Sequence, residues 1–240
     1  MTEVTEVSDV TDVSDVARRI PADARIITIA GPVAVGKSTF AQALADALVV
    51  AGRGPVEVVS TDGFLYPNNV LVARGMFERK GFPESYDTTA LTGFIRAVRN
   101  NEPAITVPEY SHDSFDITPG RTIAAPSIAI VEGVNALQSD FATEADVRIY
   151  LDADDDVVIG WYVARFVEFT RNARRSGAGF YTRFGALDDA GVAVIARQVW
   201  DAINAPNLNQ HIRPTRQAAT LVLRKARDHS LLPAAGESLS

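Results

Sequence analysis

Short β-branched apolar runs alternate with helical stretches along the chain from Arg25 onward. This alternation is typical of βαβ units, because parallel strands need a crossover helix between them. Strands are predicted at residues 26–30, 56–60, 105–110, 128–131, 147–151 and 221–223. Helices are predicted after Gly36, after the capping residue Asp87, and over residues 155–172 and 188–204. The pattern predicts a three-layer α/β fold around a mostly parallel central sheet.

Both ends of the chain depart from this pattern. Residues 2–16 read TEVTEVSDVTDVSDV, a three-residue repeat that fits neither the 3.6-residue period of a helix nor the 2-residue period of a strand. We expect residues 1–20 to be a disordered acidic tail, with a helical or partner-bound segment as the alternative. Residues 21–232 are expected to form one folded domain, and the small-residue stretch 233–240 a flexible end.

Composition excludes several classes of protein. The 240 residues contain no cysteine, which excludes disulfides, thiolate catalysis and cysteine-ligated metals. The net charge of −7 argues against a nucleic-acid backbone binder. No apolar run is long enough to span a bilayer, and the amino terminus is acidic where a secretory signal is basic. We therefore expect a cytoplasmic protein that binds neither nucleic acid nor membranes.

A phosphate-binding motif follows the first predicted strand. Residues 31–38 read GPVAVGKS and match the pattern GxxxxGK[ST], at the junction of a strand and a helix where this motif belongs. Its glycines let backbone N–H groups surround phosphate oxygens, the lysine reaches the β- and γ-phosphates, and the serine hydroxyl can join a Mg²⁺ shell. The alternative, a glycine-rich turn, does not explain the strand–helix context. The motif predicts nucleotide contacts at Gly31, Val33, Ala34, Val35, Gly36, Lys37, Ser38 and Thr39.

The rest of the chain favours a small-molecule kinase among phosphate-loop proteins. The NKxD pattern with which GTPases read guanine is absent, and no basic track of a motor or helicase is present. Such a kinase needs carboxylates at the carboxyl ends of its strands. Asp62 suits a general base, with an ordinary turn aspartate as the alternative. Glu132 suits the surroundings of Mg²⁺ or a helix cap, and Asp152 is better read as a helix cap.

Cations for the transferred phosphoryl group are expected on the helix 155–172. Arg165 stands between Tyr162 and Phe169 at helical spacing, as a phosphate clamp or as an ordinary surface arginine. The run Arg171, Arg174 and Arg175 is read as a solvated face in preference to a lid. The three histidines are too scattered to predict a metal site.

Seven segments in order make the chain resemble the type I, bacterial pantothenate kinases, relatives of uridine kinase and phosphoribulokinase. They are GPVAVGKST (31–39), STDGFLYPN (60–68), RKGFPESYD (79–87), YSH (110–112), VEGVNALQS (131–139), WYVARF (161–166) and WDAINAPNLNQHIRPTR (200–216). The resemblance covers about residues 26–229 and implies a P-loop kinase fold for the folded domain.

The resemblance implies ATP- and Mg²⁺-dependent phosphorylation of the terminal hydroxyl of pantothenate, the first step of coenzyme A biosynthesis. It implies catalytic roles for Asp62, Lys37 and Arg165, with Ser38 and Glu132 near the metal. The positions matching the family's pantothenate site are Tyr110, His112, Tyr162, Asn204 and, as its apolar wall, Phe166 and Phe169; Lys225 and His229 match positions near the adenine. A homodimer is implied as well.

The chain also departs from the family. Gln42 replaces an arginine that serves feedback by coenzyme A, so we expect weak feedback. Phe115 replaces a tyrosine, and residues 177–184 diverge. The family's longer segment before the phosphate loop is replaced by the repeat. Two alternatives stay open: a related kinase for a nucleoside or sugar, and a nucleotide-binding regulator without turnover.

Overall fold

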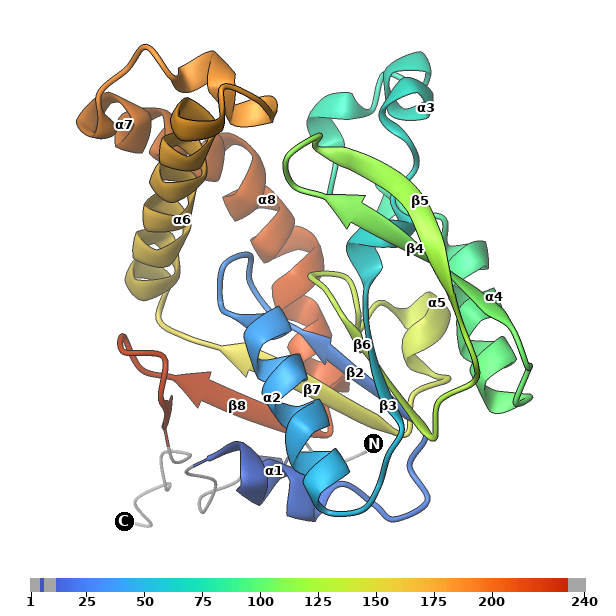
Figure 1. Ribbon diagram of the computed structural model, residues 1–240. Helices are drawn as coiled ribbons and strands as arrows, with labels where there is room; N and C mark the ends of the chain where they lie inside the picture. The colour runs from blue at the N-terminus through green and yellow to red at the C-terminus, as the bar shows by residue number, and fades with distance from the viewer. Residues whose placement is uncertain (1–4, 7–11, 233–240) are drawn as a thin grey trace, which may run out of the picture.

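A seven-stranded sheet forms the centre of the computed structural model, which describes residues 5–6 and 12–232 (Figure 1). The strand order is β1-β8-β7-β2-β6-β3, with β9 pairing antiparallel to β8 and the other pairs parallel. The strands are β1 (Thr5–Glu6), β2 (Ile26–Ala30), β3 (Val56–Ser60), β6 (Ile128–Glu132), β7 (Val147–Asp152), β8 (Leu221–Lys225) and β9 (Leu231–Leu232). The predicted α/β fold with a mostly parallel sheet is confirmed.

Helices pack on both faces of this sheet and complete the three layers (Figure 1). The helices are α1 (Val13–Arg19), α2 (Lys37–Val50), α3 (Asn68–Ala73), α4 (Thr88–Arg99), α5 (Ser139–Ala142), α6 (Asp155–Ser176), α7 (Asp189–Val199) and α8 (Ala205–Asn207). Strand β2 shows how the faces differ: Ile27 and Ile29 pack with α1 and α2, whereas Ile26 packs with α4. Every residue of β2 and β6 is buried, as expected for strands covered on both sides.

A separate hairpin, β4 (Ile105–Ser111) and β5 (Asp116–Ile123), stands outside the main sheet. The predicted strand at 105–110 is confirmed, and Pro119 and Gly120, a pair whose sequence predicts a turn, lie within β5 instead. A side chain at Gly120 would place its Cβ 2.3 Å from the carbonyl oxygen of Val107, so glycine allows the irregular register found there.

The two long helices extend further than predicted. Helix α6 ends at Ser176, and α7 continues beyond Val199 through two π-helical turns, Trp200–Asn204 and Leu208–Ile212, that flank α8. Further short 3₁₀ turns lie at 61–64, 77–79, 83–85, 180–184 and 213–218. In Figure 1, α6 and α7 stand on one side above the carboxyl ends of the strands, and the β4–β5 hairpin stands on the other.

The amino-terminal segment differs from the disordered tail predicted for residues 1–20. Helix α1 begins at a capping box in which Asp12 and Asp15 each accept a hydrogen bond from the other's backbone N–H. Val16 is fully buried in the core shared with α2, and Arg53 donates to the carbonyl oxygens of Ile20 and Pro21. The last repeats therefore supply a cap and an apolar contact. Residues 1–4, 7–11 and 233–240 lie outside the described residues.

No helix in the described ranges combines the length and the apolar character needed to cross a membrane.

Candidate active site

The phosphate loop joins β2 to α2 and has the backbone geometry of an anion cradle. Gly31 has φ +148°, and a Cβ there would lie 2.3 Å from the carbonyl oxygen of Leu151, so only glycine fits. Gly36 has φ +85° and begins α2 without a side-chain cap. The first N–H groups of α2 are thereby left to bind an anion, which the helix dipole also favours.

Lys37 is buried beneath the loop. Its Nζ donates to the carbonyl oxygens of Gly31 (3.2 Å) and Pro32 (2.9 Å). Burial lowers the pKa of Lys37 to about 8, against the opposing attraction of the Glu132 and Asp62 carboxylates. An anion bound in the loop would favour the charged ammonium and reverse this shift.

Ser38 and Glu132 lie together at the end of β6. The Ser38 hydroxyl donates to Glu132 Oε1 at 2.9 Å, and Glu132 is only 5% exposed. Burial raises the pKa of Glu132, partly countered by Lys37. Within the described residues, no three acidic or histidine side chains form a metal site by themselves. This pair offers the few oxygen ligands that Mg²⁺ takes from a protein when phosphates supply the rest.

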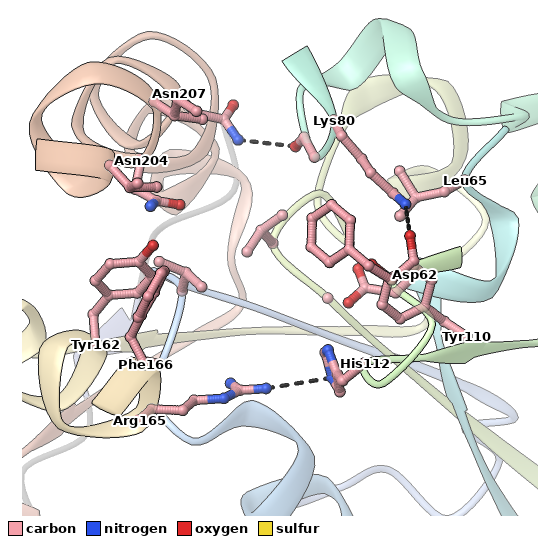
Figure 2. A pocket seen from close by; sticks show the side chains of 18 of the residues that line it. Asp62, Leu65, Lys80, Tyr110, His112, Tyr162, Arg165, Phe166, Asn204 and Asn207 are labelled. Carbon is pink, nitrogen blue, oxygen red and sulfur yellow. Dashed lines mark hydrogen bonds between the residues drawn. The ribbon is translucent and has the colours of Figure 1, made fainter. Parts of the chain in front are cut away.

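Asp62 lies on the 3₁₀ turn that follows β3, one strand away from Glu132. Its Oδ1 accepts a hydrogen bond from the Tyr86 hydroxyl at 3.3 Å, and its backbone N–H donates to Ser60 Oγ. Gly133 touches this turn, because a Cβ there would lie 1.7 Å from Thr61 Oγ1. The carboxylate is half-buried and faces the cavity (Figure 2).

Arg165 reaches across the cavity from α6 toward the β4–β5 hairpin (Figure 2). Its guanidinium lies 3.3 Å from His112 Nε2 and 5.1 Å from the centre of the Phe169 ring. Desolvation and the charge of Arg165 lower the pKa of His112, so the neutral ring accepts from the guanidinium. Tyr110 packs edge-on against His112, with ring centres 5.3 Å apart.

The opposite wall comes from α6 and the π-helical turn after α7. Tyr162 and Asn204 face each other there (Figure 2), and burial raises the pKa of Tyr162 to about 12. Phe166 packs against Tyr181 and Phe184 from the 180–184 turn. The cavity between the walls has a volume of about 430 Å³, which suits a small organic molecule.

Comparison with known proteins identifies the family. The phosphoribulokinase / uridine kinase family model matches residues 26–171. Pantothenate kinase from Clavibacter michiganensis is 45% identical over 86% of this chain and 68% of its own length; that from Shewanella amazonensis is 41% identical over 87% and 71%. The chain belongs to the pantothenate kinase family.

Solved structures show the P-loop kinase fold at lower identity. A protein from Silicibacter sp. TM1040 has a TM-score of 0.69 at 20% identity and covers 89% of this chain and 99% of its own. D-glycerate 3-kinase from Cryptococcus neoformans has a TM-score of 0.61 at 13% identity and covers 92% and 94%. These likenesses support the fold alone.

The structure brings most of the predicted site residues of this pantothenate kinase family member to one cavity. Its lining includes Val33, Ala34, Lys37, Ser38, Asp62, Tyr110, His112, Glu132, Tyr162, Arg165, Phe166, Phe169 and Asn204. Lys225 and His229 do not line it. Lys225 Nζ donates to the carbonyl oxygen of Val35 behind the loop, and His229 stacks on Trp161 with ring centres 4.2 Å apart.

Two other expectations are settled by ion pairs. Asp152 does not cap α6, which begins after Asp154; its carboxylate pairs with Arg216 at 3.3 Å. Arg171 and Arg174 both bind Asp189, and Arg175 pairs with Glu168. All three arginines are exposed and none lines the cavity, which agrees with the solvated face predicted for this run.

Sequence reasoning missed several residues of the site. Lys80 Nζ lies 4.8 Å from the centre of the Tyr110 ring and donates to Asn68 and to the carbonyl oxygen of Phe115. Burial lowers its pKa to about 8. Asn207 Nδ2 donates to the carbonyl oxygen of Gly81, next to Lys80, at 2.8 Å. The only signal was that both residues fall within matched segments, RKGFPESYD and WDAINAPNLNQ.

Proposed function

We propose that this protein transfers the γ-phosphoryl group of ATP to the terminal hydroxyl of pantothenate, the first step of coenzyme A biosynthesis. The observation that carries the proposal is one cavity lined by phosphate-loop residues together with Asp62 and Arg165, which enter it from opposite walls (Figure 2). The 41–45% identity to pantothenate kinases supports the choice of acceptor.

The loop and Lys37 hold the phosphates. The backbone N–H groups at the start of α2 donate to phosphate oxygens, and the buried ammonium of Lys37 turns from the carbonyl oxygens of Gly31 and Pro32 to the β- and γ-phosphates. Thr39, in the first turn of α2, contributes its backbone N–H.

Ser38 and Glu132 are the residues that would hold Mg²⁺. Their hydrogen bond joins a hydroxyl and a carboxylate beside the phosphate loop, an oxygen donor set that fits this ion. When bound, Mg²⁺ neutralises charge on the phosphate oxygens.

Asp62 and Arg165 serve the reaction itself. The acceptor oxygen forms a bond to the γ-phosphorus while the bond from that phosphorus to the β,γ-bridging oxygen breaks, and ADP leaves. The acceptor proton goes to the Asp62 carboxylate, and the Tyr86 hydroxyl at 3.3 Å keeps that carboxylate in place. The Arg165 guanidinium stabilises negative charge on the group in transfer.

Neutral polar side chains orient the acceptor. Tyr110, His112, Tyr162 and Asn204 hydrogen-bond the amide, hydroxyl and carboxylate groups of pantothenate, while Phe166 and Phe169 contact its carbon skeleton. The proposal extends beyond this cavity. His229 and Lys225 lie near the adenine of ATP. Two copies of the chain form a homodimer, and light scattering in solution tests this oligomeric state.

An acceptor panel tests the proposal. Purified protein is incubated with ATP, Mg²⁺ and either pantothenate, a nucleoside such as uridine, or a sugar, and ADP release is measured. We expect turnover with pantothenate at least a hundredfold above the others. Preferential turnover of uridine or a sugar would contradict the proposal, and tight ATP binding with no turnover of any acceptor would favour a regulator.

A further inference from the structure

The turn at residues 180–184 closes one side of the cavity. It follows α6 and leans toward the β4–β5 hairpin (Figure 1). The Phe180 backbone N–H donates to the carbonyl oxygen of Asp113 at 2.8 Å, and the Phe180 ring stacks on Phe115 with centres 4.1 Å apart. This turn is therefore docked on the hairpin, and its side chains have defined places at the cavity.

Arg183 on this turn is both exposed to solvent and part of the cavity lining, which places it at the rim. Its guanidinium lies 3.7 Å from the centre of the Phe180 ring, and its Nε donates to the Phe180 carbonyl oxygen at 3.1 Å. Stacking on an aromatic face and one backbone hydrogen bond restrict the guanidinium while leaving further N–H donors free for a ligand.

No ion pair involves Arg183 within residues 5–6 and 12–232, in contrast to the neighbouring arginines. Arg171 and Arg174 share Asp189, and Arg175 pairs with Glu168. A cation held in place at the mouth of a cavity, without a protein carboxylate of its own, suits an anionic ligand.

The other cations of the described cavity lining are already engaged by protein groups. Lys37 donates to the carbonyl oxygen of Gly31 under the phosphate loop. Lys80 donates to Asn68 and to the carbonyl oxygen of Phe115, and Arg165 donates to His112. Glu78, also exposed, lies on the rim but contributes a negative charge that repels anions. Arg165 is exposed as well, but the proposed function assigns it to the group in transfer, which leaves Arg183 as the rim cation for a carboxylate.

We propose that Arg183 is a specificity-determining residue that binds the anionic end of the acceptor at the cavity mouth. The proposal rests on the proposed function. Pantothenate carries its phosphorylated hydroxyl at one end and a carboxylate at the other. With the hydroxyl beside Asp62, the carboxylate extends away from the phosphates and toward the opening. There a charge-assisted hydrogen bond to Arg183, added to those from the neutral side chains, favours the acid over uncharged analogues.

The test compares two acceptors that differ only at this end: pantothenate, and pantothenyl alcohol, in which an uncharged CH₂OH group replaces the carboxylate. For Arg183→Gln we expect the KM for pantothenate to rise about tenfold with kcat nearly unchanged, since a bond to a charged group is lost. The KM for pantothenyl alcohol, or its inhibition constant if it is not turned over, should change less than twofold. Arg183→Lys should recover part of the loss, because it retains the charge.

Arg175→Gln is the matched control, since it removes an exposed arginine that does not line the cavity. This variant should change neither the KM for pantothenate nor the KM or inhibition constant for pantothenyl alcohol. The melting temperatures of all variants should agree within a few degrees. Equal losses for acid and alcohol in Arg183→Gln, or no loss for the acid, would overturn the inference while leaving the proposed function intact. Wild-type protein that does not phosphorylate pantothenate would instead refute the proposed function, and this inference with it.

Discussion

The phosphate side and the acceptor side of the cavity are built in different ways. The phosphate side comes from one continuous segment, residues 31–38, together with Glu132 from the adjacent strand β6. The acceptor side is assembled from the 3₁₀ turn after β3, the β4–β5 hairpin, α6, the 180–184 turn and the π-helical turns after α7. Phosphate binding therefore depends mainly on residues that are close together in the sequence, whereas the choice of acceptor depends on packing between distant segments.

The largest effect should come from the point where the two sides meet. Asp62→Asn keeps the size of the side chain but removes the proton acceptor, so kcat should fall by about 10²–10⁴ while ATP binding is retained. Asp152→Asn is a control at another strand end, since that carboxylate pairs with Arg216 outside the cavity. Steady-state kinetics and ATP titration distinguish the two. Near-normal turnover by Asp62→Asn would remove this residue from the proton transfer.

The second-largest effect should come from the close packing of Gly133 against the turn that carries Asp62. Gly133→Ala places a Cβ where Thr61 Oγ1 already lies, at 1.7 Å, so the turn that carries Asp62 must shift. We expect a loss of about 1–3 kcal/mol in stability and about tenfold in kcat/KM. Gly160→Ala is the matched control, because this glycine lies within helix α6 and its new Cβ would meet no neighbouring atom within 4 Å. Alanine there should raise the free energy of unfolding by about 0.5–1 kcal/mol. Equal denaturation midpoints and rates for both variants would contradict the predicted clash.

A pH dependence distinguishes the phosphate side from the acceptor side. The free protein holds the pKa of Lys37 near 8, below its usual 10.5, so Lys37 loses its charge as pH rises above about 8. Bound phosphate raises the pKa again, so ATP binding between about pH 8 and 10 should take up a proton. The ATP affinity should then weaken by up to about tenfold per pH unit.

Calorimetry in buffers of different ionisation enthalpy measures this proton uptake. The pKa of Lys80 is also lowered to about 8, but Lys80 lies on the acceptor side. Lys80→Gln should therefore retain the uptake on ATP binding. Its disappearance in this variant would assign the proton to Lys80 and contradict the prediction for Lys37.

The smallest effect concerns coenzyme A. Gln42 is uncharged and donates to Asp46 at 2.9 Å, so α2 offers no cation there to the phosphates of coenzyme A. We expect little inhibition by coenzyme A at concentrations equal to that of ATP, and stronger inhibition of the Gln42→Arg variant. Tight competition against ATP by coenzyme A in the wild-type protein would contradict this expectation.

The difference between the two sides also explains what the sequence could predict. A strand, a glycine-bounded loop and a helix N-terminus follow from local residue patterns, which is why the phosphate loop and the acids at the ends of β3 and β6 were placed correctly. The roles of Tyr110, His112, Tyr162 and Asn204 came from family resemblance, since no periodicity connects three segments that lie about 40 to 95 positions apart.

Lys80 and Arg183 show where local patterns reach their limit. Lys80 occupies the acceptor side because Asn207 Nδ2, more than a hundred residues away, holds the adjacent Gly81 carbonyl. Arg183 lies in a divergent segment, and only the folded chain shows that it lines the cavity and has no acidic partner within the described chain. The start of α1 could have been predicted, because Asp12 and Asp15 have the spacing of a capping box. The three-residue repeat led to a prediction of disorder instead.

The most direct measurement is a crystal structure with a non-hydrolysable ATP analogue, Mg²⁺ and pantothenate bound together. The account predicts the triphosphate in the loop at residues 31–38 and an Asp62 carboxylate oxygen within hydrogen-bond distance, about 2.6–3.2 Å, of the terminal hydroxyl. A closed complex in which that hydroxyl contacts another carboxylate, with Asp62 beyond the reach of even one bridging water, would contradict it.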